Sequence, residues 1–139
     1  MIVVKSGRPW AHAATGVTGA AYHFLLLPAV AELPAPAWAK AAGYGWLVLD
    51  GALGGAQVAK LNPEITHQLR SGAHLPAAVW VAAAGLSGTW WLAVVGVLFA
   101  IMQAGSTLLI NTKLLRPWTF WVQAGLNVTW MAAVAVTLA

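Results

Sequence analysis

The chain has 139 residues, of which 60% are hydrophobic and only 7% are charged, and its mean hydropathy is +0.76. A soluble domain usually carries about 25% charged residues, so this composition indicates an integral membrane protein. The absence of cysteine excludes disulfides, thiolate metal sites and cysteine nucleophiles. The formal net charge is +4, but the basic residues lie singly at the ends of apolar segments. This placement is typical of membrane-flanking anchors and not of a nucleic-acid surface.

The first half of the chain predicts two membrane helices and a short polar helix. We expect the first helix over about 9–30, because Arg8-Pro9 is a good helix start. A second apolar helix is expected over about 37–60. Asn62-Pro63-Glu64 then predicts a new helix start, with an N-cap, a proline and an acid in the first turn. The polar residues that follow predict a short helix over about 63–71 at the membrane surface. The alternative is that this piece continues across Pro76 into the next helix, which is otherwise short for a membrane crossing.

The second half predicts three further membrane helices. The apolar stretch from Leu75 to Ile110 is too long for one crossing of about 20 residues. The glycines in Gly85-Leu-Ser-Gly88 are typical of a break, so we expect helices over about 74–87 and 89–111. A last helix is expected over about 117–138. The fold predicted is therefore all-α: one compact bundle, residues 1–139, of about five transmembrane helices with one short interfacial helix.

The basic residues also predict the orientation in the membrane. With five crossings and a cytoplasmic N-terminus, all of them except Lys40 fall on the cytoplasmic side. With four crossings, Lys113 and Arg116 would lie outside, so five crossings fit the positive-inside rule better. We expect a multi-pass protein of the cell (inner) membrane with an external C-terminus.

Asp50 lies near the middle of the second apolar segment. A carboxylate at the bilayer centre costs roughly 2.5–3.5 kcal/mol on insertion scales, so it should face protein or water. Trp46 and Gln57 share its face of the predicted helix.

Gly51 and Gly55 form a small-xxx-small pair, and Gly54 adds to the same surface, which predicts close packing of another helix. Gly16 and Gly19 form a second close-packing face on the first helix.

Further polar side chains lie on the last two predicted helices: Gln103 and Thr107 on one, Gln123 and Asn127 beside Trp130 on the other. One interpretation is hydrogen bonding between helices, worth about 0.6 kcal/mol per contact on average. The other is a polar pocket that these side chains share with the intramembrane carboxylate. Intramembrane ionisable residues are functional candidates by default, so we expect the carboxylate to lie within reach of these amides.

No cofactor or metal is predicted. His12 and His23 would lie on one side of the first helix, but helices that hold two haems usually place their ligands further apart. The other two histidines, His67 and His74, lie in the polar connection that follows the second helix. Haem binding through His12 or His23 is therefore disfavoured, and we interpret His12 as an interfacial residue and His23 as a hydrogen-bonded core residue. The expected partners are the lipid bilayer and copies of the chain or other membrane subunits, without nucleic acid.

The sequence shows no family signature, and three functional classes stay open. Asp50 is the candidate catalytic or proton-carrying residue, and Trp46, Gln57, Gln103, Thr107, Gln123, Asn127 and Trp130 are the candidate ligand-binding residues. They favour a protein that handles a small or lipophilic ligand, either as a carrier or as a membrane-embedded enzyme. The alternative is a structural or accessory subunit of a larger membrane complex, which fits the small size and the short loops.

Overall fold

The computed structural model describes residues 9–109, 112 and 117–139, and this part of the chain is helical without a strand. Five long helices and one short helix follow each other: α1 (Pro9–Leu25), α2 (Leu27–Glu32), α3 (Ala37–Val58), α4 (Pro63–Ser87), α5 (Trp90–Leu109) and α6 (Pro117–Leu138). The predicted all-α helical bundle is thus confirmed. By length and composition, two helices could cross a membrane, namely α5 and, within α6, Trp118–Leu138.

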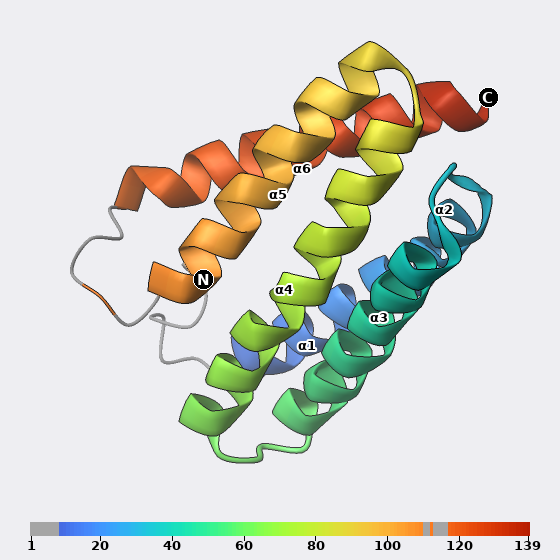
Figure 1. Ribbon diagram of the computed structural model, residues 1–139. Helices are drawn as coiled ribbons and strands as arrows, with labels where there is room; N and C mark the ends of the chain where they lie inside the picture. Colours follow the sequence, from blue (N-terminus) through green and yellow to red (C-terminus); the bar gives the residue numbers. More distant parts are fainter. Residues whose placement is uncertain (1–8, 110–111, 113–116) are drawn as a thin grey trace.

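The long helices pack mainly against their neighbours in the chain. α1 packs on α3, α3 on α4, α4 on α5 and α5 on α6, while the short α2 touches α1, α3 and α6. α3, α4 and α5 lie side by side, and α1 and α6 lie behind them (Figure 1). The largest fully buried side chains include Trp80 on α4 and Trp130 on α6, so the core lies where these layers meet.

The helix predicted over 9–30 is broken at Leu26, which separates α1 from α2. Pro28 explains the break, because it has no N–H for the carbonyl of Phe24 and its ring would clash with that carbonyl. The N–H of Leu26 instead donates to the carbonyl of His23, at 3.1 Å, and closes α1 with a tighter turn. His23 therefore lies in the last turn of α1, directly before a change of direction.

The separate surface helix predicted over 63–71 is wrong, because α4 runs without interruption from Pro63 to Ser87. Its start is as predicted: the Asn62 side chain accepts from the N–H groups of Glu64 and Ile65, at 3.0 and 3.2 Å. Pro76 lies inside the helix. The proline removes one backbone hydrogen bond, and the packing of α4 against α3 and α5 compensates this loss. The polar residues 63–71 therefore become the first turns of a long helix of the bundle.

The close contact between α1 and α3 is made by two of the predicted glycines, Gly16 and Gly54. A Cβ added to Gly16 would lie 2.8 Å from the carbonyl oxygen of Gly54, and one added to Gly54 would lie 3.0 Å from that of Gly16. By contrast, a Cβ on Gly51 or Gly55 would meet nothing within 4 Å. The prediction of close packing is therefore confirmed at Gly16 and Gly54 and wrong at Gly51 and Gly55.

Candidate functional site

Asp50 lies at the point where α1, α3 and α4 meet, and its side chain is completely buried. Its two carboxylate oxygens face cationic or titratable groups from the two neighbouring helices, Arg70 of α4 and His23 of α1. We call Asp50, Arg70, His23 and Gln57 the charge network. It links three helices around one acid.

Arg70 binds both carboxylate oxygens of Asp50 in a bidentate contact. Its Nε donates to Oδ1 at 3.1 Å and its Nη2 to Oδ2 at 2.8 Å, while Nη1 donates to Oε1 of Gln57 at 2.8 Å. Arginine stays charged in proteins, and paired N–H bonds to both oxygens are the geometry that an ionised carboxylate prefers. An unpaired buried ion is penalised by several kcal/mol, so the pairing explains how Asp50 is tolerated as an anion without contact with solvent.

His23 adds the third helix to the charge network. Its Nε2 lies 3.2 Å from Oδ2 of Asp50, and its Nδ1 lies 2.5 Å from the carbonyl oxygen of Gly19. The Nε2 contact is close enough for an ion pair but lacks the alignment of a full hydrogen bond. The imidazole ring also makes edge-to-face contacts with the rings of Tyr22 and Trp46, at ring-centroid distances of 5.3 and 5.0 Å. These contacts fix its orientation toward the carboxylate.

Gly19 is the residue of α1 that makes room for the guanidinium. A Cβ at this position would lie 2.8 Å from Nη2 of Arg70, the same nitrogen that donates to Asp50. A larger residue would therefore push the end of Arg70 away from the carboxylate. The carbonyl of Gly19 also faces His23, so this single residue positions both partners of the acid.

A row of tryptophans leads from the charge network to α6. Trp46 stacks on Trp80 at a centroid distance of 6.0 Å, and Trp80 meets Trp130 edge-to-face at 6.3 Å. All three side chains are buried. The predicted residues Trp46 and Trp130 thus lie at the two ends of one aromatic row that runs from His23 to α6.

The amides of α6 lie apart from the acid. Asn127 accepts a hydrogen bond from the hydroxyl of Tyr22 at 3.0 Å, which ties α6 to α1 next to His23. Gln123, one turn earlier, is half-buried. The hydrogen bonds of the charge network join Arg70 to Asp50 and Gln57 and do not include Gln123. The polar contacts of Asp50 come from Arg70 and His23, and Asn127 instead bonds to Tyr22, whose ring contacts His23.

The polar residues of α5 face α4. Thr107 donates to the backbone carbonyl of Ser71 at 3.1 Å. Gln103 is buried, and its Oε1 makes no hydrogen bond with the described residues. Thr107 thus ties α5 to α4, as in the packing interpretation, whereas no hydrogen bond of the described residues assigns a partner to Gln103 Oε1.

Two members of the charge network were not predicted, Arg70 and His23. Arg70 was assigned to a surface helix, which would have placed it outside the bundle. A helix that continues across Pro76 brings Arg70 inward, and the scarcity of charges in the apolar segments then makes it the natural partner of Asp50. His23 was interpreted as a hydrogen-bonded core residue, which its bond to Gly19 fits.

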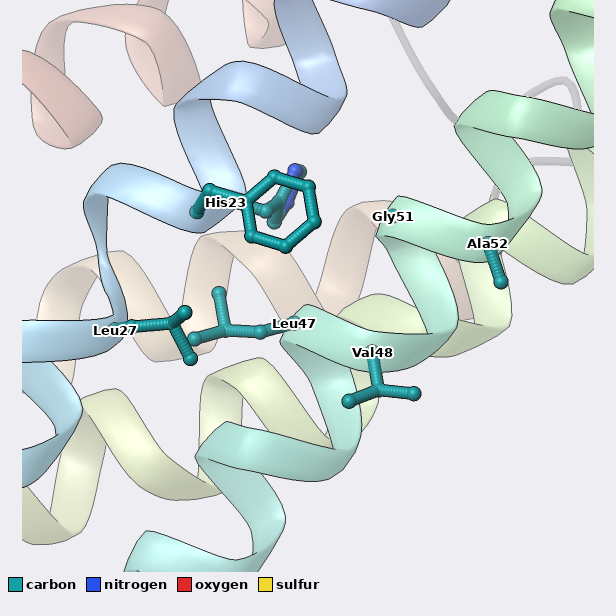
Figure 2. Close-up of a pocket in the computed structure, with 7 residues that line it drawn as sticks. His23, Leu27, Leu47, Val48, Gly51 and Ala52 are labelled. Carbon is teal, nitrogen blue, oxygen red and sulfur yellow. The ribbon is translucent and has the colours of Figure 1, made fainter.

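An apolar groove of about 240 Å³ opens between α1, α2 and α3. It is lined by His23, Phe24, Leu27, Leu47, Val48, Gly51 and Ala52. Figure 2 shows His23 and Leu27 on one side of the groove and Leu47, Val48 and Gly51 on the other. His23 is its one titratable residue, so the groove ends at the charge network.

The described residues contain no group of three or more His, Asp or Glu side chains that could hold a metal ion. The side chain of His12 lies outside the part of the chain that the structure describes, so its predicted role is untested.

No family model, curated protein or solved structure matches this chain. Its function is therefore inferred from the geometry of the charge network and of the groove beside it.

Proposed function

We propose that this is a multi-pass membrane protein that binds a lipophilic ligand in the groove between α1 and α3 and handles it next to the charge network. The observation that carries this proposal is the position of His23, which lines the groove and also contacts Asp50. A ligand with an apolar body fits the groove, and its end then lies against the imidazole. Ligand sites are commonly apolar clefts with a few polar groups at a fixed place.

The proposed membrane arrangement has five crossings, made by α1, α3, α4, α5 and α6, with a cytoplasmic N-terminus in the cell (inner) membrane. The apolar composition and the basic residues at the segment ends support it. The pairing of Arg70 with Asp50 supports a membrane position for α3 and α4 as well, because it satisfies the two charges within the protein.

Of the two forms of ligand handling, the geometry favours a carrier over an enzyme. Asp50 is held as an anion by Arg70, so it is not the free carboxylic acid that a proton-donating catalyst needs. The charge network can still exchange protons through His23, because an imidazole nitrogen can both accept and donate a proton. Asp50 then acts through His23 and does not touch the ligand itself.

The groove is tested by photo-crosslinking in nanodiscs with a fatty acid that carries a diazirine on its chain. Gly51→Leu fills the groove, and the structure predicts that the variant folds because a Cβ there meets nothing within 4 Å. Gly45→Leu is the matched control: it lies on α3, its Cβ also meets nothing within 4 Å, and it does not line the groove.

We expect saturable labelling of groove residues on α1 and α3, lost in Gly51→Leu and kept in Gly45→Leu. Labelling spread evenly over all lipid-facing helices, and equal in both variants, would contradict the proposal.

A second candidate, an accessory subunit or homo-oligomer, is favoured by the exposed aromatic side chains of α5 and α6. Trp90, Trp118 and Trp121 are 78%, 60% and 65% exposed. Large exposed apolar side chains fit a membrane interface, and they also fit a partner helix. Native mass spectrometry from nanodiscs distinguishes the two: a single chain at all concentrations contradicts the subunit proposal, and a defined oligomer supports it.

A further inference from the structure

Both ring nitrogens of His23 face hydrogen-bond acceptors. Nδ1 lies 2.5 Å from the carbonyl oxygen of Gly19, which has lone pairs and no proton to give. The proton in this contact therefore belongs to Nδ1, which donates it to Gly19. A neutral imidazole has only one N–H group. If the ring of His23 is neutral, that group is Nδ1–H, and Nε2 then carries no proton.

The other ring nitrogen, Nε2, lies 3.2 Å from Oδ2 of Asp50 and is buried. It makes no full hydrogen bond with the described residues. In a neutral ring protonated at Nδ1, Nε2 carries a lone pair, and that lone pair would face the lone pairs of a carboxylate. A second proton between the two atoms replaces this repulsion by an attraction, whichever of the two atoms holds it.

We propose that His23 and Asp50 bind one proton between them, and that this proton closes the groove between α1 and α3. The site is a proton-binding site inside the bundle, built from the last turn of α1 and the middle of α3. The effect of the proton on the groove rests on the proposed function, whereas the binding of the proton by His23 and Asp50 does not. The proton comes from water and returns to water, and no other bond is made or broken.

The groups that face His23 come from three helices. Asp50 lies on α3, Arg70 and His74 on α4, and Tyr22 precedes it on α1 with its ring edge-on. With Arg70 and the shared proton the charge network carries one net positive charge, since Arg70 and His23 contribute +1 each and Asp50 −1. His74 interacts electrostatically with Asp50, Arg70 and His23.

The position of His23 connects the proton to the groove. The residue lies in the last turn of α1, directly before the break at Leu26, and Leu27 beyond the break lines the groove. The other end of α1 is held to α3 by the Gly16–Gly54 contact. Loss of the proton therefore loosens the end of α1 that carries the groove and leaves the other end attached.

The proton is tested by solid-state NMR of the wild-type chain in lipid bilayers, with ¹⁵N-histidine and ¹³C-aspartate. Asp50 is the only aspartate of the chain, so dephasing by aspartate carbon selects the histidine nitrogen that lies against it. We expect that nitrogen to be protonated at pH 7, with both ring nitrogens of His23 in the N–H form, and to lose its proton in Asp50→Asn. An unprotonated Nε2 in the wild type at pH 7 would overturn the shared proton.

The effect on the groove is tested by distances between spin labels. The chain has no cysteine, so Leu27→Cys and Val48→Cys can be labelled specifically on the two sides of the groove. We expect the distance to increase when the pH is raised from 5 to 9, and the change to be absent in His23→Gln and kept in His67→Gln, an exposed histidine of α4. An unchanged distance, or the same change in His23→Gln, would overturn the coupling even where the groove binds its ligand.

Discussion

Replacement of Arg70 by methionine leaves the buried carboxylate of Asp50 without its cationic partner. The carboxylate loses two of its three close polar contacts: both guanidinium bonds, at 3.1 and 2.8 Å, disappear, and only His23 Nε2 at 3.2 Å remains. Asp50 cannot reach water, because it is 0% exposed. Removing one partner of a buried ion pair destabilises a protein by about 3–5 kcal/mol. We expect a loss in this range for Arg70→Met.

The opposite replacement, Asp50→Asn, should be milder. Arg70 keeps its bond to Gln57 at 2.8 Å, and its side chain is 18% exposed, so part of the guanidinium can be solvated. The amide still accepts one hydrogen bond from the guanidinium. A loss of about 1–3 kcal/mol is expected from the weaker acceptor.

The double variant Asp50→Asn, Arg70→Met removes both charges. Paired removal of a buried ion pair is often close to neutral, so the double variant should be more stable than Arg70→Met alone. The assay is unfolding in mixed micelles followed by tryptophan fluorescence and, independently, by circular dichroism. If the two single losses add up in the double variant, the two residues are not coupled and the network is refuted as a stabilising unit.

Three further outcomes are expected. Gly16→Leu should destabilise the fold, because its side chain would meet the carbonyl of Gly54 at 2.8 Å, and thermal unfolding in detergent measures the loss; an unchanged midpoint would contradict the contact. Asn62→Ala should cost about 1 kcal/mol, since two N–H groups lose their acceptor, and Asn62→Asp should restore most of it in the same assay. Reporter fusions after Lys113 and after Ala139 should report opposite sides of the membrane; the same side for both would refute five crossings.

The helical fold could be predicted from the sequence because apolar length and helix-start signals are local properties. Asn62 is an example: its side chain caps α4 as its position before Pro63 indicates. The extent of α4 could not be predicted, because Pro76 and the polar residues before it both argue locally against a continuous helix. Packing against α3 and α5 overrides these preferences.

The central residue of the candidate site, Asp50, could be predicted from the sequence, but its partners Arg70 and His23 could not. A lone acid in an apolar segment must find a partner, so the burial of Asp50 follows from the sequence. Which partner it finds depends on how helices far apart in the chain pack, and Arg70 reaches it only because Gly19 of α1 leaves space for the guanidinium. No pattern within one segment contains that information.

The contact between Arg70 and Asp50 inside a lipid bilayer is the most direct test of the whole account. With ¹³C-aspartate and ¹⁵N-arginine, a dipolar coupling to an arginine side chain can come only from Asp50, the single aspartate of the chain. The structure predicts strong coupling to two guanidinium nitrogens, because Nε and Nη2 lie 3.1 and 2.8 Å from the carboxylate oxygens. A bilayer sample in which no arginine nitrogen couples to the aspartate carboxyl carbon would contradict the charge network and the function proposed from it.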